Sequence, residues 1–230
     1  MNFLSVFETP DVTTSGSAHS GERRIGAMRY GTDHKQKSYE RILDEASQAI
    51  RLDGPHKVGV AAVMSQAGLT HGAFYAHFSS KDALIEAAIA YMFEGSLSRW
   101  QQVTQDVTPQ QGLSRFIDHY LSVERMDQRP LGCPMAALAA DVPRMSPAVQ
   151  AVFSAGVRTL TQAMAEKLAA MGVPDPDTTA RSMMNELVGA ISLARCEPDR
   201  ARSLSMLDAT RTKVKARIGI GASSGDNSSP

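Results

Sequence analysis

The sequence has few residues of the kinds that build covalent or metal-based centres. Only two of its 230 residues are cysteines, Cys133 and Cys196, and no metal-ligand spacing links them. This pattern argues against a disulfide scaffold or a zinc site and is typical of a reducing compartment, so we expect a cytoplasmic protein. A glycine-rich phosphate loop and a cluster of metal ligands are both missing from the sequence, and we therefore expect no cofactor and no metal.

Long apolar runs are also missing. The longest apolar-rich stretch, residues 83–93, is interrupted by Glu86, so it predicts a core helix and not a membrane-spanning one. The N-terminus lacks the basic start, the apolar middle and the small-residue cleavage site of a secretory signal. We therefore expect no membrane partner.

The net charge is zero, which taken alone argues against a nucleic-acid partner, but the charges are unevenly distributed. Residues 35–81 contain six basic and four acidic side chains, a net charge of +2. Histidines are also concentrated in or beside this stretch: His34, His56, His71 and His77. The distribution permits DNA binding without requiring it.

Helical periodicity is present along most of the chain. Apolar residues at 42, 46, 49 and 50 form one stripe on a helix that stops near Gly54. A short second helix is expected over 60–66 with its end at Gly68, a third after Thr70 as N-cap, and a fourth after Ser80. Later helices are expected over 110–125, 134–142, 146–171, 177–195 and 199–217. Because strand-like alternation is nowhere sustained, the sequence predicts an all-α fold.

Two short helices joined by a tight glycine turn, with a first helix packed behind them, describe a helix-turn-helix. Val63 and Met64 can bury the first of the two short helices, and Phe74 can anchor the second. The other face of the second helix then points outward. A small residue near its N-terminus, Gly72, lets this helix lie deep in a major groove.

The residues of this motif resemble a known signature. The run AGLTHGAFYAHFSSKDAL at 67–84, with RILDEA upstream at 41–46, is similar to the TetR/AcrR family of bacterial helix-turn-helix transcriptional regulators. The similarity covers roughly residues 37–90. One departure is Ala76, because many relatives carry a basic residue there. The resemblance implies a sequence-specific DNA-binding regulator, expected to be a repressor and not an enzyme.

The resemblance also implies roles for individual residues. Thr70 and His71 face base edges or nearby phosphates, Tyr75 and His77 contact phosphates, and Lys81 meets the DNA backbone. Alternatives remain open, since His77 can instead hydrogen-bond within the domain and Lys37 can belong to a solvated tail. The predicted DNA-binding residues are Lys37, Thr70, His71, Gly72, Tyr75, His77 and Lys81.

The chain then divides into four parts. Residues 1–33 form a disordered N-terminal tail, within which Met28 starts a segment that looks like a family N-terminus. Residues 34–83 form the three-helix helix-turn-helix domain, and residues 84–218 a helical effector-binding and dimerisation domain. Residues 219–230, rich in Gly and Ser, form a second disordered tail.

The second domain carries two apolar stripes near the end of the chain. Paired with the same helices of a second chain they would form a four-helix interface of a homodimer, and otherwise they belong to an internal core. A dimer is favoured because a single helix-turn-helix makes too few contacts for useful specificity. The stripes are Met183, Met184, Leu187, Val188 and Ile191, then Leu204, Leu207, Val214 and Ile218.

An effector pocket is expected among aromatic and methionine side chains of this domain. Methionine is adaptable and common at surfaces that accept varied ligands, although it is more often core filler. No charged residue stands out as a ligand anchor, which indicates an apolar or neutral effector. The predicted pocket residues are Trp100, Phe116, Tyr120, Met135, Phe153 and Met164.

Cys133 is a possible redox sensor. It precedes Pro134, so a helix starting there would place the thiol at a helix N-terminus, where the dipole stabilises a thiolate. The segment LGCPMAAL at 131–138 resembles one in a subgroup of these regulators, some of which sense electrophiles or oxidants through cysteine. The alternative is a small buried apolar cysteine.

Two other classes of function compete with a ligand-controlled regulator. Cys133 with His119 and Asp118 could imitate a thiol hydrolase, although no nucleophile signature surrounds them. A helix-turn-helix protein without a small-molecule switch is the other alternative. A ligand-dependent loss of DNA affinity would separate a switched regulator from an unswitched one.

Overall fold

The computed structural model describes the backbone of residues 21–221 and the side chains of residues 34–221. The chain forms two compact units, residues 1–37 and 38–230. The described backbone of the first unit is helical and belongs to α1 (Gly21–Asp53). The tail predicted over 1–33 is therefore helical from Gly21 onward, because adding residues to an existing helix is easier than nucleating one. Residues 1–20 and 222–230, the rest of the two predicted tails, lie outside the described residues.

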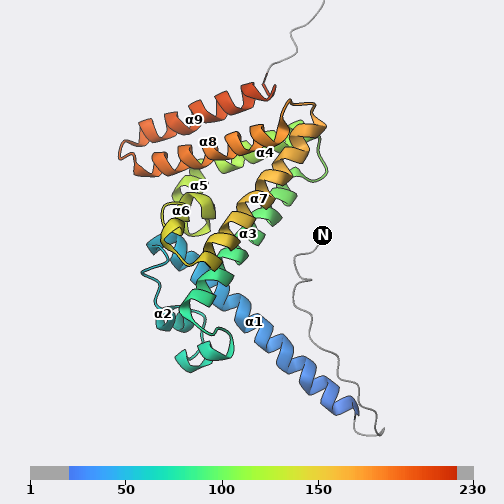
Figure 1. Cartoon of the computed structure of the whole chain (residues 1–230), viewed down its shortest axis with the longest axis vertical. Coiled ribbons are helices and arrows are strands. Elements are labelled where there is room, and N and C mark those ends of the chain that lie inside the picture. Colours follow the sequence, from blue (N-terminus) through green and yellow to red (C-terminus); the bar gives the residue numbers. More distant parts are fainter. Residues whose placement is uncertain (1–20, 222–230) are drawn as a thin grey trace, which may run out of the picture. The chain divides into compact units, whose positions relative to one another are not determined.

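Every regular element between residues 21 and 221 is a helix (Figure 1), which confirms the all-α prediction. The helix-turn-helix region comprises α1, α2 (Val60–Gln66) and the 3-10 helix η2 (His71–Ala76). The larger helices that follow are α3 (Lys81–Thr104), α4 (Pro109–Tyr120), α7 (Pro147–Ala170), α8 (Pro176–Cys196) and α9 (Arg200–Arg217). Shorter elements join them: α5 (Val123–Asp127), η3 (Arg129–Leu131), α6 (Pro134–Leu138) and η4 (Val142–Arg144).

Capping residues set most of these boundaries. Ser80 accepts a hydrogen bond from the Ala83 amide and starts α3, as predicted. One helix expected over 110–125 is in fact two, because Leu121 leaves helical geometry and Ser122 caps α5. The helix expected over 134–142 ends at Leu138, and Val142 instead starts the 3-10 helix η4.

The core of the second domain is built on α3, α7 and α8. Phe93 of α3 lies so close to α7 that a Cβ at Gly156 would meet its ring atoms at 2.2–2.6 Å. Phe93 also meets Phe153 edge-on, with ring centroids 5.4 Å apart. The glycine therefore allows the two longest helices after α1 to pack closely.

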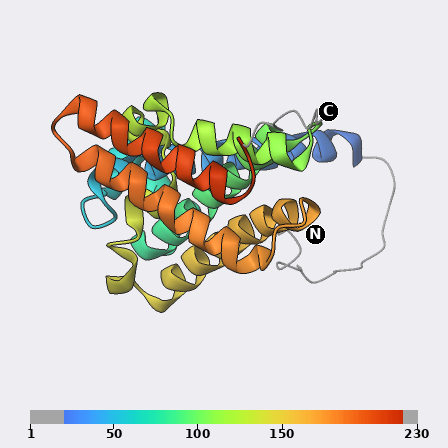
Figure 2. The same ribbon diagram turned by 90° about the horizontal axis from the view of Figure 1, so that it is seen from above.

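Helices α8 and α9 lie side by side (Figures 1 and 2). The two apolar stripes that favoured a dimer interface are mostly buried between these helices and the rest of the same chain. The prediction of an interface is therefore wrong for the buried residues, and the alternative of an internal core is right. The buried residues are Met183, Met184, Leu187, Ile191, Leu207, Val214 and Ile218.

Within the described residues, no helix combines the length and the apolar character that crossing a membrane requires.

Candidate nucleic-acid interface

Three aromatic rings hold the helix-turn-helix together. Phe78 stacks on Tyr39 of α1 with centroids 5.3 Å apart and on Phe74 of η2 at 5.7 Å. Phe74 and Phe78 are 2% and 5% exposed. Because both phenylalanines face inward, the intervening residues of η2 face outward.

The turn between α2 and η2 depends on Gly68. Its φ is +71°, in the left-handed region that favours glycine. The Gly68 amide donates to the Ser65 carbonyl at 3.0 Å, and the Leu69 amide donates to the Met64 carbonyl at 2.8 Å. These bonds satisfy carbonyls at the end of α2, as a helix C-terminus requires.

The third helix of the motif begins at the predicted residue but is a 3-10 helix over its whole length. Thr70 is its N-cap, and among the described residues its side chain makes no capping hydrogen bond. The contact is instead between backbones, with the Ala73 amide donating to the Thr70 carbonyl at 3.1 Å.

The outward face of η2 carries four of the predicted DNA-binding residues. Thr70, His71 and Gly72 are exposed, and the Tyr75 side chain is 71% exposed. The His71 and Tyr75 rings meet edge-on at 6.4 Å. An aromatic side chain held this far out of the core, beside hydrogen-bond donors, is typical of a recognition surface.

Gly72 has no role that packing explains. A Cβ added there would meet no atom within 4 Å among the described residues, and its φ is not in the left-handed region. The absence of a side chain is therefore not required by this chain's own fold. It leaves space on the outer side of η2, as the sequence predicted for close approach to DNA.

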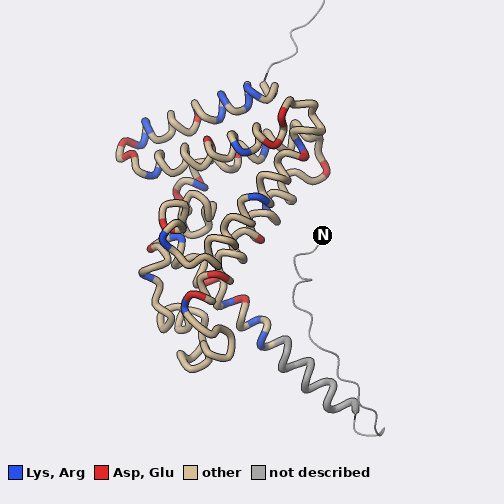
Figure 3. Tube along the Cα trace, in the orientation of Figure 1, with Lys and Arg blue, Asp and Glu red and all other residues tan. Residues whose placement is uncertain are grey.

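No lysine, arginine, aspartate or glutamate occurs between Val58 and Ser80. Figure 3 shows the α2–η2 segment without coloured charges. The cations nearest in sequence are Lys57 and Lys81, both outside the motif's two short helices. Arg41 is also close, because a Cβ at Gly68 would lie 3.9 Å from its Nη1. The sequence-based site list omitted Arg41 and Lys57, although both are exposed cations of the same region.

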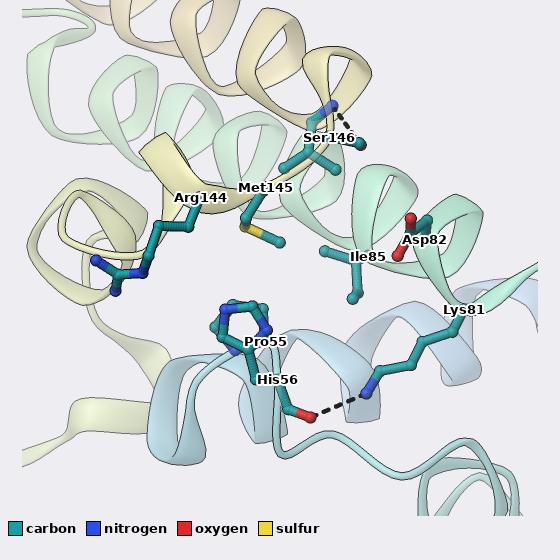
Figure 4. A pocket seen from close by; sticks show the side chains of 9 residues that line it. Pro55, His56, Lys81, Asp82, Ile85, Arg144, Met145 and Ser146 are labelled. Carbon is teal, nitrogen blue, oxygen red and sulfur yellow. Dashed lines mark hydrogen bonds between the residues drawn. The ribbon is translucent and has the colours of Figure 1, made fainter.

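The remaining predicted residues are less exposed or lie elsewhere. His77 is half-buried, with its ring 6.2 Å from Tyr39 and 6.3 Å from Phe78. Lys81 is half-buried at the start of α3, and its Nζ donates to the His56 carbonyl at 3.0 Å (Figure 4). Lys37 is exposed on the part of α1 that belongs to the first unit.

A hollow of about 230 Å³ adjoins this lysine. It lies between the loop after α1, the start of α3 and the segment that leads into α7 (Figure 4). Its charged lining residues have both signs: Lys81, Arg144 and Asp82. The hollow is therefore lined by residues of both the helix-turn-helix and the second domain.

Two family models match the chain over these regions. The model of bacterial regulatory proteins of the tetR family matches residues 42–88. The model of the LmrA/YxaF-like transcriptional regulator C-terminal domain matches residues 109–209, so the two matches together exceed half of the chain. The chain belongs to the TetR family. It is a DNA-binding transcriptional regulator of that family.

Individual relatives agree with this assignment. The HTH-type transcriptional regulator UidR of Escherichia coli strain K12 is 27% identical over 192 residues, which cover 78% of this chain and 92% of UidR. YvdT of Bacillus subtilis strain 168, an HTH-type transcriptional regulator, is 43% identical over 49 residues, 21% of this chain and 25% of YvdT.

Solved structures share the fold. Reduced E. coli NemR has a TM-score of 0.71 at 20% identity, covering 81% of this chain and 99% of NemR. A TetR regulator of Chloroflexus aurantiacus J-10-FL has a TM-score of 0.68 at 21% identity, covering 80% and 94%.

The second domain of this TetR-family regulator contains a cavity of about 30 Å³. Three of the six predicted pocket residues line it, namely Phe116, Tyr120 and Met135. Trp100 does not line it but supports Phe116, with ring centroids 4.8 Å apart. The other two predicted residues are elsewhere: Phe153 packs on Phe93, and Met164 is fully buried in the core.

The sequence singled out no charged residue as a ligand anchor, whereas the cavity lining includes cationic side chains and a histidine. Arg99, His119 and Arg125 line the same cavity. They come from three helices, α3, α4 and α5, and Arg125 is brought there by the break after Tyr120 that the sequence did not predict. Residues this far apart in sequence converge only in the folded chain.

Burial raises the pKa of Tyr120 well above its usual value, and the neighbouring Cys133 raises it further. Burial, followed by Arg125 and Arg99, lowers the pKa of His119. The phenol is therefore kept protonated and the imidazole is kept neutral. Both groups remain able to donate or accept hydrogen bonds without carrying charge.

Cys133 is the N-cap of α6 and is buried, while Cys196 is exposed. Both interpretations of Cys133, a helix N-terminal thiol and a buried small residue, thus describe its position. The hydrolase-like triad is not assembled. The Asp118 carboxylate pairs with Lys215 at 2.7 Å and Arg211 at 3.5 Å, on the exposed side of α4.

Proposed function

We propose that this regulator is a repressor that binds a palindromic operator as a homodimer and is released by an effector. The observation that carries the proposal is the inward anchoring of Phe74 and Phe78, which leaves a row of exposed donors on η2. In this proposal Thr70 and His71 read base edges, while Tyr75, His77 and Lys81 contact phosphates.

Dimerisation is proposed through the outer surface of α8 and α9. Leu193 is 60% exposed and Leu204 is 36% exposed, although both belong to otherwise amphipathic helices. Gly189 lies one turn before Leu193, and a Cβ there would meet nothing within 4 Å among the described residues. A half-buried glycine one turn before an exposed leucine suits close helix–helix contact with a second chain. Light scattering should give a dimer for the parent chain and a monomer for Leu193→Glu.

The effector cavity is connected to the helix-turn-helix by two routes. Helix α3 carries Lys81 at one end and Arg99 near the other. Arg51, in the last turn of α1, donates to the Pro130 carbonyl at 3.2 Å, in the segment that leads into α6. A ligand that moves α6 or α3 therefore changes the position of the recognition helices, and DNA and effector oppose each other by linkage.

A thiol-reactive effector is the second form of the switch. Cys133 caps α6 at the cavity wall, so adding a bulky group to its sulfur would displace the cavity lining. N-ethylmaleimide should then weaken operator binding by the parent and by Cys196→Ser, but not by Cys133→Ser. Equal loss of DNA binding in both variants would remove Cys133 from the proposal.

One observation favours the alternative of a helix-turn-helix protein without a small-molecule switch. A cavity of about 30 Å³ has room for about one or two water molecules, so an organic ligand requires the lining to move. This alternative predicts operator affinity that no ligand or thiol reagent changes.

The experiment that tests the proposed function is selection of bound sequences from random duplex DNA by the full chain at near-physiological salt. Enrichment of an inverted repeat supports a sequence-specific dimer. A folded, dimeric protein that enriches no sequence would contradict the proposal. Thr70→Ala and His71→Ala should alter the preferred bases, whereas Tyr75→Ala should weaken binding to all of them.

A further inference from the structure

The cavity beside α6 has cationic walls without a matching anion. The Arg99 and Arg125 guanidinium groups make no ion pair with a carboxylate among the side chains described, and no aspartate or glutamate of residues 34–221 lines the cavity. Burial, followed by the neighbouring Arg99, lowers the pKa of Arg125. Arg125 is half-buried, and Arg99 is exposed. A positive charge held partly away from water beside another one is unfavourable unless something compensates it.

Polar atoms near the same place lack strong partners. His119 Nε2 is buried and makes no hydrogen bond within the described part of the chain, and the buried Tyr120 hydroxyl has only the Cys133 thiol as a side-chain hydrogen-bond neighbour there. Tyr120 is 8% exposed, and both side chains line the cavity. An unsatisfied buried polar group costs about 1–3 kcal/mol and a thiol is a weak hydrogen-bond partner, so both groups favour a ligand with oxygen acceptors.

A third arginine, Arg51, reaches the region from the helix-turn-helix side. Arg51 Nε is buried without a partner among the described residues, while its Nη1 donates to the Ser47 hydroxyl and to the Pro130 carbonyl. Burial and the nearby Arg125 lower the pKa of Arg51 to about 10, against the effect of Cys133. The cationic cluster thus extends from the cavity to the end of α1.

We propose that this cavity binds a small organic anion, a carboxylate carried on an apolar or aromatic body, and that this anion is the effector. The inference rests on the proposed function for its regulatory meaning only. The carboxylate would lie between Arg99 and Arg125 and accept hydrogen bonds from Tyr120 and His119. Arginine guanidinium groups match carboxylate geometry and bind it with charge-assisted hydrogen bonds.

The rest of the lining selects the body of the ligand. It consists of Phe116, Met135, Leu160 and Met184, apart from Ser96 and Cys133. Methionine side chains change rotamer readily, so Met135 and Met184 can enlarge a cavity of about 30 Å³ when a ligand enters. Since Met135 belongs to α6, this enlargement moves the helix that directly follows η3, whose Pro130 carbonyl accepts the hydrogen bond from Arg51.

The larger hollow beside Lys81 is a weaker site for the same ligand. Its lysine already donates to the His56 carbonyl, and its arginine already pairs with Asp141 at 3.0 Å. Asp82 in its wall would repel a carboxylate. None of the buried unpartnered atoms in the described side chains belongs to its lining.

Thermal unfolding of the full chain, without DNA, tests the inference. The probes are benzoate, phenylacetate and octanoate, each compared at equal concentration with its neutral primary amide. We expect at least one carboxylate to raise the unfolding temperature in a saturable manner while its amide does not. Titration calorimetry should then give an affinity for the acid at least about tenfold higher than for the amide, since a charged group's hydrogen bonds are worth about 1.5–3 kcal/mol.

Variants locate the binding site. Arg125→Gln and Arg99→Gln should each weaken carboxylate binding about tenfold or more. Arg115→Gln on α4, an exposed arginine that does not line the cavity, should leave it unchanged. Tyr120→Phe should weaken binding by a smaller factor, and circular dichroism checks that each variant is folded. If one variant does not fold, the other arginine carries the test.

The outcomes separate this inference from the proposed function. Equal binding of acids and amides, no stabilisation by any of the three acids, or full binding by Arg99→Gln would overturn the inference. None of these results bears on operator recognition. Conversely, a carboxylate that binds through Arg125 but leaves the selected operator bound would support the anion site and contradict its role as effector.

Discussion

The proposed recognition segment and the proposed effector cavity differ in their charge. Residues 58–80 carry no charged side chain and direct neutral donors outward. Arg99, Arg125 and His119 line the cavity, whose described lining contains no carboxylate. DNA carries many phosphates, so a few flanking lysines supply electrostatic attraction and neutral donors can contact the bases. A single small anion offers one charge, so a pocket that selects it needs several partners around that charge.

The first prediction concerns a buried aromatic residue of the helix-turn-helix, Phe78. Phe78→Ala removes a ring that is 5% exposed and stacks on both Tyr39 and Phe74. We expect a loss of about 3–5 kcal/mol in the free energy of unfolding, measured by urea denaturation, together with loss of operator binding. The matched variant is Tyr75→Ala, whose side chain is 71% exposed. It should change stability by less than about 0.5 kcal/mol and still weaken DNA binding. A large loss of stability in Tyr75→Ala would show that this ring supports the fold.

The second prediction compares alanine substitutions at two glycines, Gly156 in α7 and Gly72 in η2. In Gly156→Ala the new Cβ meets the Phe93 ring at 2.2 Å, and overpacking should cost about 1–3 kcal/mol, more than the helix propensity gained. In Gly72→Ala the new Cβ meets nothing within 4 Å among the described residues. Stability should stay the same or rise by up to about 1 kcal/mol, while operator affinity falls about tenfold, or ~1.4 kcal/mol.

Urea denaturation and fluorescence anisotropy on a labelled operator measure the two effects separately. The comparison fails if Gly72→Ala destabilises the chain or binds DNA like the parent. Gly156→Ala serves as its control, because once folded it should bind the operator normally.

Much of the fold followed from local signals. The second helix, the turn at Gly68 and the cap at Ser80 were predicted at the residues where they occur, because glycine and N-cap chemistry act within a few residues. Two features were not predicted. One is the 3-10 geometry of η2, and the other is the break after Tyr120, where Ser122 caps the next helix.

The two sites differ in how far the sequence revealed them. Apart from Lys37, the predicted DNA-facing residues lie within one short run, 70–81, and a motif can name them. The cavity is lined by Arg99, His119 and Arg125, which come from three helices. Their spacing along the chain does not predict that they lie close together in the fold. Half of the predicted pocket residues were found there because apolar periodicity places them inside the domain, but periodicity does not say which cavity they share.

The third prediction concerns the salt dependence of operator affinity. If the charge-free segment binds through neutral donors, few cations account for the release of counterions from DNA. Lys81→Gln should reduce the slope of log Kd against log salt by about 0.9, the value for one phosphate contact. Tyr75→Phe should weaken binding and leave the slope unchanged, because a phenol carries no charge. An unchanged slope in Lys81→Gln would show that its bond to the His56 carbonyl, and not a phosphate, is its role.

The last and smallest effect is the pH dependence of anion binding. Burial and the cations Arg125 and Arg99 lower the pKa of His119 in the free protein, against the effect of Glu124. A carboxylate bound beside the imidazole would raise that pKa, so binding takes up a proton. Affinity for the tightest carboxylate probe should therefore increase from pH 8 to pH 6. The increase should stay below about tenfold, since a full pKa unit corresponds to tenfold.

His119→Gln keeps a hydrogen-bond donor and removes the titration, so calorimetry on this variant should show affinity that is nearly constant over the same range. The free protein provides an independent check of sign. Because the folded state holds His119 neutral below its usual pKa, the unfolded chain binds more protons as pH falls from 7 toward 6. Stability should decline over that range in the parent and less in His119→Gln. A probe affinity that weakens with falling pH would place the carboxylate away from His119, and the cationic walls would then have to act through the two arginines alone.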